Sequence, residues 1–442
     1  MKKRLTAAAL ALVALIAAGT PGGARGYRER TQRIAPGVTY TSIKDPRGPF
    51  RIHVVSADLS RPSTFDVELA RDKLPGFETT SSMAYRNNAL VAINGDYARE
   101  SGRPVMAFAE DGRLMQTPLV WGRNFAVNVT ETDSYIGHPA ISAWAYEPDV
   151  ASLHSVQRMN EGQPGYSEMA AYTREGGREE RPPTYACATR LYPTEAPRIN
   201  YEHGGVEVNH YVDETSCSPS RVYPQGGTTI AAAMGSQREP EMAGFIPGEQ
   251  VTLGWSLGWS GVFDTVGGNP TLVENGSISV QQENDPFFTR HPRTGVGSTP
   301  DGRILMVIVD GRRPGYSVGM TPRQFAKLFL SLGADWALNL DGGGSTTMTV
   351  NGRIVNRPSD GNERAVSSAL LLLPGSDPGE VQPAPAESPA PLPLISPHDA
   401  AGQWRQIVRD PASTGGLASA LMERGKPLPR SISRAARAFD RR

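Results

Sequence analysis

Three short apolar runs in this sequence each lead into a turn that combines an acidic residue with glycine. Residues 89–93, 304–309 and 336–340 read ALVAI, ILMVIV and WALNL, and they are followed by NGD, DGR and DGGG. Short apolar runs bounded by turn residues are typical of buried strands. A chain patterned in this way is expected to pair its strands into sheets and to place acidic turns at the ends of those strands.

A helix pattern lies between the second and third runs. Thr321 is the predicted N-cap, Gln324 completes a capping box, and Gly333 ends the helix. Its apolar face is expected to hold Phe325, Leu328, Phe329 and Leu332. A strand-helix-strand unit brings the ends of its strands together when the strands pair. We therefore expect Asp310 and Asp341 to face one cleft.

Turn residues are frequent along the whole chain. Its 442 residues include 47 Gly and 37 Pro, which favours short strands over long helices. Residues 65–69 alternate like a strand, and Asn-Gly turns predict hairpins over 272–280 and 348–355. The irregular section 145–225 is expected to be β-rich. The sequence thus predicts a mixed α+β or α/β fold that is dominated by sheet and has few helices.

The N-terminus has the pattern of a secretory signal peptide. Lys2, Lys3 and Arg4 precede an apolar run over residues 5–18, and small residues follow. An uncleaved anchor is the alternative, although the run is short for a membrane span. We expect a secreted, periplasmic or cell-envelope protein without stable membrane insertion after cleavage. The expected segments are a signal peptide over 1–26, a main domain over 27–374, a Pro/Ala-rich linker over 375–397 and an Arg-rich tail over 398–442.

Charge, cysteine and histidine usage bear on nucleic-acid binding, on disulfide formation and on metal binding, respectively. Lys+Arg and Asp+Glu both number 45, so no overall field attracts nucleic acid, and none is expected to bind. Cys187 and Cys217 are the only cysteines, and export favours a disulfide between them, with about 3 kcal/mol of stabilisation. The seven histidines are scattered and make no metal-ligand pattern, so we expect no metal and no cofactor.

Several motifs occur together in one order. They are NGD at 94–96, RTGVG from Arg293, DGR from Asp310, NLDGGGS from Asn339, NRPSD from Asn356 and ERAVS from Glu363. This set resembles the phosphodiester glycosidase family, most strongly over residues 267–373, with Gly295 where alanine is expected. The resemblance implies a sheet-dominated fold. It also implies hydrolysis of sugar-1-phosphodiesters of the N-acetylglucosamine-1-phosphate type, in cell-wall or capsular glycans, by cleavage between the anomeric carbon and the phosphate oxygen.

The candidate catalytic residues suit that chemistry. Glycoside cleavage usually employs two carboxyl groups, and Asp341 is the first candidate and Asp310 the second. A departing phosphate monoester, with a second pKa near ~6, needs little protonation. One carboxylate is therefore expected to do most of the work, and His291 could supply a proton where one is needed.

The candidate binding residues are cationic, polar or glycine. Arg293 is the first choice for the phosphate and Arg364 the second, because a guanidinium group contacts phosphate oxygens in pairs. The glycines at 342–344 are expected to form an anion nest of backbone N–H groups. The full set of expected substrate- or phosphate-binding residues is Arg293, Thr294, Asn339, Gly342, Gly343, Gly344, Ser345, Arg364, Asn94 and Asp96.

Simpler interpretations stay open for these residues. Asp341, Asp310, Asn94 and Asp96 could be turn residues, Arg293 a surface ion pair, and His291 a packing residue. Trp255 and Trp259 in a Gly-rich stretch are expected to pack rather than to bind sugar. Two other functions remain as alternatives: a non-catalytic polysaccharide-binding protein on the same scaffold, and a phosphodiesterase that cleaves the P–O bond.

Overall fold

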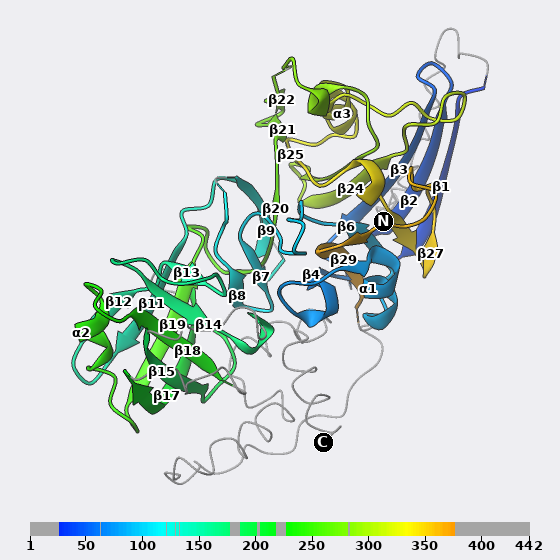
Figure 1. Cartoon of the computed structure of the whole chain (residues 1–442). Coiled ribbons are helices and arrows are strands. Elements are labelled where there is room, and N and C mark those ends of the chain that lie inside the picture. Colours follow the sequence, from blue (N-terminus) through cyan, green and yellow to red (C-terminus); the bar gives the residue numbers. More distant parts are fainter. Residues whose placement is uncertain are drawn as a thin grey trace, which may run out of the picture.

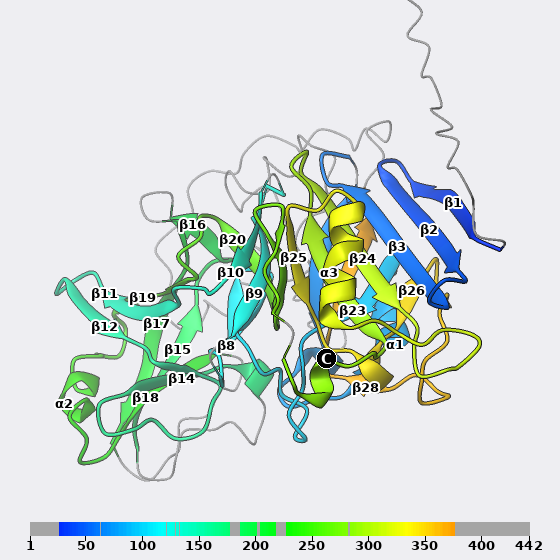
Figure 2. The ribbon, with the colours of Figure 1, turned by 90° about the horizontal axis from the view of Figure 1, so that it is seen from above.

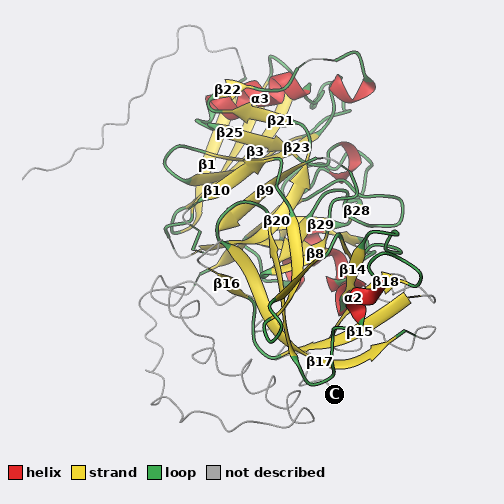
Figure 3. Ribbon diagram, turned by 90° about the vertical axis from the view of Figure 1, so that its left-hand side faces the viewer, coloured by secondary structure: helices red, strands yellow, loops and turns green. Residues whose placement is uncertain are grey.

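The computed structural model describes residues 26–375, apart from 62, 121, 129, 132, 177–185, 201–203, 218–226 and 282. The expected signal peptide, linker and tail lie almost wholly outside the described residues. Strands dominate the described part and its helices are short, which confirms the predicted sheet-dominated fold (Figure 3). Within that part, no helix is both long enough and apolar enough to cross a membrane.

An eight-stranded antiparallel sheet carries most of the site motifs. Its order is β1 (Arg28–Ala35), β2 (Val38–Asp45), β3 (Phe50–Asp58), β24 (Arg303–Val309), β23 (Arg293–Ser298), β25 (Trp336–Asn339), β21 (Thr271–Glu274) and β22 (Ser277–Ile278). The helix α3 (Pro322–Ser331) packs on this sheet (Figure 2) and begins at the predicted capping box of Thr321 and Gln324. A Cβ at Gly295 would lie 2.9 Å from the ring of Phe325, so this glycine leaves room for the helix.

The strands β24 and β25 do not pair with each other. β23 lies between them and is antiparallel to both, with Arg293 opposite Val309 and Gly295 opposite Asn339. β24 and β25 therefore run parallel, about 10 Å apart at ordinary strand spacing. Their carboxyl ends, which lead into Asp310 and Asp341, reach the same edge of the sheet, and the start of β23 lies between them.

A five-stranded sheet packs against the first one. Its order is β27 (Arg353–Ile354), β26 (Met348–Val350), β6 (Val91–Asn94), β29 (Ser368–Pro374) and β4 (Ser63–Leu69). Ile93 and Leu370 share one buried cluster with Val296 and Leu338 of the larger sheet. The helix α1 (Thr80–Arg86) covers the other face, as shown by the cluster that joins Met83 to Ala92 and Leu371. The end of β6 is thereby held against the end of β25. A two-stranded ladder pairs β5 (Glu78–Thr79) with β28 (Ala365–Val366).

A second five-stranded sheet and a nine-stranded sheet complete the described part. The nine-stranded sheet forms a separate lobe (Figures 1 and 2). The former contains β10 (Ser134–Gly137), β9 (Arg123–Asn128), β20 (Val262–Gly268), β7 (Phe108–Glu110) and β8 (Arg113–Gln116). The latter contains β12 (Ser152–Ser155), β11 (Ser142–Glu147), β19 (Gln250–Ser256), β17 (Gly205–Ser216), β15 (Ala186–Pro193), β18 (Thr228–Ala233), β14 (Met169–Tyr172) and β13 (Arg158–Met159), with β16 (Arg198–Asn200) beside β17.

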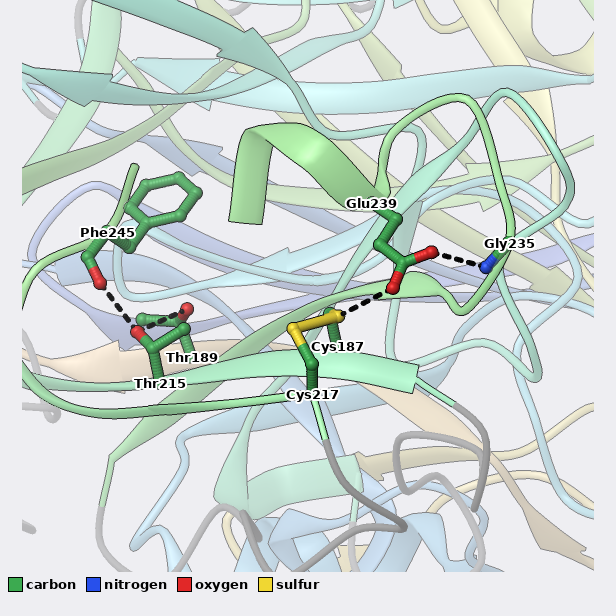
Figure 4. Close-up of a disulfide and its surroundings, with 7 residues drawn as sticks. All are labelled: Cys187, Thr189, Thr215, Cys217, Gly235, Glu239 and Phe245. Carbon is green, nitrogen blue, oxygen red and sulfur yellow. Dashed lines mark hydrogen bonds between the residues drawn. A yellow bond between two sulfur atoms is a disulfide. The ribbon is translucent and has the colours of Figure 1, made fainter. Parts of the chain in front are cut away.

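The expected disulfide joins Cys187 to Cys217 within this lobe. It links β15 to the residue after β17, next to the paired residues Ala188 and Ser216, and the short helix α2 (Glu239–Met242) lies over it (Figure 4). The Cys187 sulfur is 3.4 Å from a carboxylate oxygen of Glu239. The predicted β-rich section 145–225 supplies most of the strands of this lobe, which extends to Ser256.

Candidate functional site

The backbone of Asp341 is fixed where the two packed sheets meet. Its N–H donates to the carbonyl oxygen of Gly95 at 3.1 Å, and its own carbonyl oxygen accepts from the Asn94 side chain at 2.7 Å. Asn94 is fully buried, and its Oδ1 accepts from the Thr294 hydroxyl at 2.8 Å and from the Thr347 N–H at 3.2 Å. Asn94 and Thr294 thus hold the strand ends together rather than present free groups to a ligand.

The carboxylate of Asp341 is half-buried and lies over its own glycine loop. The Gly342 N–H donates to its Oδ1 at 2.8 Å, and the Ser345 hydroxyl also donates to the carboxylate. Burial raises the pKa of Asp341, while these two hydrogen bonds and the charge of Arg364 act in the opposite direction. The arrangement presents a carboxylate whose basicity is increased by burial and whose orientation is fixed.

Asp96 is a second, fully buried carboxyl group close enough to respond to Asp341. Its Oδ2 accepts from the N–H groups of Val105 and Met106 at 3.0 and 2.7 Å, whereas its buried Oδ1 has no hydrogen-bond partner among the described residues. Burial raises the pKa of Asp96 to about 7, and the negative charge of Asp341 contributes to the rise. Asp96 therefore carries a proton during part of the time at neutral pH.

The half-buried Tyr97 and the buried Asn339 form a polar pair beside these carboxyl groups. The Tyr97 hydroxyl accepts from the Asn339 side chain at 2.7 Å and donates to the Asn269 carbonyl oxygen at 2.7 Å. Burial and the charge of Asp341 raise the pKa of Tyr97, so it stays a neutral hydroxyl. Asn339 also donates to Leu340, and its Oδ1 is buried without a partner in the described part of the chain.

Arg293 is buried and braces three backbone segments. Its Nε donates to the Met320 carbonyl oxygen at 3.0 Å, and its Nη2 donates to the carbonyl oxygens of Phe287 and Thr289. Burial lowers its pKa to about 10, and the nearby charge of Arg312 adds to the effect. Since these bonds occupy two of its three nitrogens, only Nη1 remains for the predicted contact with phosphate, which stays a prediction.

His291 lies between two neighbours that fix its tautomer. Its Nε2 is 3.0 Å from the Pro286 carbonyl oxygen, which only accepts, so Nε2 carries the proton. Its Nδ1 faces the Nε and Nη2 of Arg312, both at 3.4 Å. Burial lowers the pKa of His291, and the charges of Arg293 and Arg312 lower it further. His291 is thus a neutral imidazole whose proton is already donated, and its role as a proton donor stays a prediction.

Asp310 is buried and bound on both oxygens. Its Oδ1 accepts from the Asn356 side chain at 3.1 Å, its Oδ2 accepts from the Tyr316 hydroxyl at 3.0 Å, and the Arg357 N–H approaches both oxygens. Burial raises its pKa, and these hydrogen bonds oppose the rise. The contacts are those of a brace that ties residues 356–357 to the end of β24, and a catalytic role for Asp310 stays a prediction.

The glycine loop is largely closed on itself. The Gly342 N–H is taken by Asp341, and the Gly343 N–H donates to the Pro292 carbonyl oxygen at 2.9 Å. Two of the three N–H groups of the expected anion nest are therefore occupied within the protein, and anion binding by this loop stays a prediction. Gly343 has a φ of +63°, which a residue with a Cβ rarely adopts. Arg312, Asp360 and Arg364 lie over the outer face of this loop.

The family of this site follows from a comparison with known proteins. Residues 203–373 match the model of the phosphodiester glycosidase family. This segment is a domain of the phosphodiester glycosidase family. The matched segment of the glycosidase domain contains Asp310, Asp341 and the loop over which Arg312, Asp360 and Arg364 lie. Asn94, Asp96 and Tyr97 precede it in the sequence, and Asn94 ends β6, which pairs with β26 and β29 of the matched segment.

Individual relatives resemble only part of the chain. An uncharacterized SPbeta prophage-derived protein of Bacillus subtilis is 43% identical over 83 residues, 19% of this chain and 13% of that protein. N-acetylglucosamine-1-phosphodiester alpha-N-acetylglucosaminidase of Bos taurus is 35% identical over 103 residues, 20% of this chain and 19% of that protein. The matches thus span less than a fifth of these curated relatives. A putative exported protein of Burkholderia pseudomallei has a similar fold, with a TM-score of 0.52 and 23% identity over 74% of each chain.

Four residues of the candidate site were not selected from the sequence. They are Tyr97, Arg312, Asn356 and Asp360. Each of them lies in or next to one of the motifs NGD, DGR and NRPSD, so their positions in the sequence could have suggested them. Their contacts join segments far apart in the chain, for example Asn356 to Asp310 and Tyr97 to Asn339, and no local pattern reports such contacts.

Other features of the molecule lie outside this site. A cavity of about 680 Å³ lies against Met106, Asn124 and Val156, away from the glycine loop. Asp66, Asp111 and Asp264 bring carboxylate oxygens within 4.8 Å of one another. The Asp111 N–H donates to Asp264, and burial with the charge of Asp111 raises the pKa of Asp264.

Proposed function

We propose that this protein is an exported hydrolase that cleaves the C–O bond between the anomeric carbon and the phosphate of sugar-1-phosphodiesters. The observation that carries the proposal is the carboxylate of Asp341. It is half-buried, oriented by Gly342 and Ser345, and close to cationic side chains that lie over the same loop. The glycosidase domain and the enzyme name of the bovine relative support the substrate class, with N-acetylglucosamine-1-phosphate-type diesters as the first choice.

Asp341 would act on the sugar while cations act on the phosphate. The transition state of glycoside cleavage has oxocarbenium character, so a carboxylate beside the anomeric carbon serves as base, nucleophile or stabilising charge. The departing phosphate monoester gains negative charge as the bond breaks. Guanidinium groups near the loop neutralise that charge, which lowers the barrier without a strong proton donor.

Asp96 would act through Asp341 and not on the substrate. Its side chain is buried, so it cannot reach the reacting atoms. With a pKa raised to about 7, it is often protonated at neutral pH. A neutral Asp96 leaves Asp341 as the charged carboxylate of the pair, because two adjacent carboxylates resist simultaneous ionisation. We therefore assign Asp96 as a positioning residue.

The test is hydrolysis of a sugar-1-phosphodiester, such as an alkyl diester of N-acetylglucosamine 1-phosphate, in ¹⁸O-labelled water. We expect the label in the sugar and release of an unlabelled phosphate monoester. Label in the phosphate would indicate P–O cleavage by a phosphodiesterase. Tight binding of phosphate-containing glycans without any turnover would instead indicate a polysaccharide-binding protein. A panel of wall and capsular glycans then identifies the natural substrate.

A further inference from the structure

Two guanidinium groups lie directly against the glycine loop. A Cβ placed on Gly343 would be 2.9 Å from Arg312 Nη2 and 3.3 Å from both its Cζ and its Nη1. Similar distances to three atoms of one planar group show that the face of this guanidinium lies over Gly343. A Cβ on Gly344 would collide with Arg364 and with Asp360. The glycines therefore make room for side chains above the loop.

Asp360 lies between these two cations. Its Oδ2 accepts from Arg364 Nε at 3.0 Å and also from Arg364 Nη2. Its Oδ1 is 4.0 Å from Arg312 Nη1. The side chains of Arg312, Asp360 and Arg364 are 44%, 37% and 49% exposed, so a solute can reach all three. A carboxylate carries one negative charge on two acceptor oxygens, as a phosphodiester does on its two non-bridging oxygens.

Arg312 and Arg364 have donors that the fold does not use. Among the described residues, Arg364 bonds only to Asp360, and Arg312 makes two long hydrogen bonds with His291 beside its 4.0 Å ion pair with Asp360. Arg312 also has a φ of +59°, an uncommon backbone conformation for a residue with a side chain. By contrast, the buried Arg293 is tied to three backbone carbonyl groups. The exposed pair is therefore better placed to receive an anion from solution.

We propose that Arg312 and Arg364 form the phosphate clamp of this site, and that Asp360 occupies the place of the substrate phosphate in the free protein. The identity of the anion as a phosphodiester rests on the proposed function. On binding, the phosphate displaces Asp360 and accepts hydrogen bonds from both arginines over Gly343 and Gly344. This position lies beside Asp341, because Ser345 of the same loop donates to the Asp341 carboxylate. The carboxylate of Asp360 thus competes with the substrate for the two arginines. A ligand displaces it best when two of its phosphate oxygens accept hydrogen bonds from these arginines.

The first experiment measures binding of inorganic phosphate to the full chain by isothermal titration calorimetry. Asp360→Asn removes the competing charge and should tighten phosphate binding by about 2- to 5-fold, the range that an exposed ion pair supports. Arg312→Gln should weaken it by about tenfold or more, because a hydrogen bond to a charged group is lost. The matched controls are Asp301→Asn and Arg353→Gln, which change exposed residues elsewhere and should leave the affinity unchanged.

A second variant tests the loop without removing a charge. Gly344 does not have a left-handed φ, so Gly344→Ala is tolerated by the backbone, while its Cβ displaces the flexible ends of Arg364 and Asp360. We expect weaker phosphate binding at an unchanged melting temperature. Unchanged phosphate affinity in Gly344→Ala, or an equal or weaker affinity in Asp360→Asn, would overturn the proposal.

The two hypotheses fail separately. The phosphate affinities of the variants could follow the predicted order in a protein that does not hydrolyse diesters. That result would reject the proposed function and support the clamp. Diester hydrolysis with a KM that Arg312→Gln does not raise would reject the clamp and leave the proposed function in place.

Discussion

The side-chain amide of Asn94 donates a hydrogen bond to the main-chain carbonyl oxygen of Asp341 at 2.7 Å, although the residues are 247 positions apart. Asn94 ends β6 of one sheet, and Asp341 follows β25 of the other. The bond therefore joins two packed sheets at the edge where the glycine loop begins. A buried amide that bonds to three partners keeps the carboxylate of Asp341 in a fixed position.

Replacement of Asn94 by alanine should destabilise the protein. The change removes hydrogen bonds to Asp341, Thr294 and Thr347 at a fully buried position, and it leaves those groups unpaired. We expect a loss of about 3 kcal/mol in the free energy of unfolding, measured by urea denaturation. The exposed Asn362→Ala is the control and should change little. A wild-type midpoint for Asn94→Ala would show that the bonds at this edge are dispensable.

Asp341→Asn should separate catalysis from folding. The amide oxygen can still accept from Gly342, so the loop keeps its shape, but the charge and the basicity are lost. Turnover of a sugar-1-phosphodiester should fall by at least ~10²-fold, with a nearly unchanged melting temperature. Asp301→Asn should have neither effect. Normal turnover in Asp341→Asn would remove Asp341 from the mechanism, and a collapse of the melting temperature would identify it as a turn residue.

Arg293→Lys should act first on stability. A lysine retains the charge, but it cannot donate from two separate nitrogens to Met320, Phe287 and Thr289 at once. We expect about 2 kcal/mol of destabilisation from the buried carbonyl groups left unpaired. Thermal denaturation together with steady-state kinetics checks this. A raised KM at full stability would instead support the phosphate contact that the sequence suggests.

The stability of the protein should depend on pH through Asp96. Its folded pKa of about 7 exceeds the usual value of 3.8, so the folded state binds the proton more tightly than the unfolded state. Its contribution is therefore most favourable below pH ~4 and is lost as the pH rises to about 7, by up to about 4 kcal/mol. Asp96→Asn should abolish this part of the profile, so the variant gains stability relative to wild type as the pH rises. Urea denaturation at pH 4.5 and 8 measures the difference, and a difference independent of pH would contradict the assignment.

Removal of the disulfide should affect stability and not turnover. Cys187 and Cys217 are 30 residues apart and lie in the nine-stranded lobe, whose core is distinct from that of the site sheets. A double serine variant should lose about 3 kcal/mol and retain its KM and turnover for a phosphodiester. Mass spectrometry of the alkylated protein establishes the oxidation state. Free thiols in exported material, or a selective loss of turnover in the variant, would contradict this view.

Local features of the fold could be predicted from the sequence. The capping box of Thr321 and Gln324 begins α3 as expected, because its hydrogen bonds join residues three positions apart. The turns at Asn275-Gly276 and Asn351-Gly352 have the positive φ values that an Asn-Gly hairpin needs. The buried strands β6 and β24 follow from apolar runs alone. Such features depend on residues that are close together in the chain and on which residues are apolar. Both can be read from the sequence.

The candidate site could be predicted only as a set of motifs. The sequence indicates Asp341, the three glycines and the acidic strand ends. It does not indicate that β23 separates β24 from β25, that Arg293 is tied to backbone carbonyl groups, or that the Arg312 guanidinium lies against Gly343. Those contacts join segments whose approach depends on how two whole sheets pack. Residue types and their spacing thus determined the strands, turns and motifs of this protein, whereas the partners of each charged group were decided by tertiary packing, because a hydrogen bond depends on distances that sequence separation does not contain.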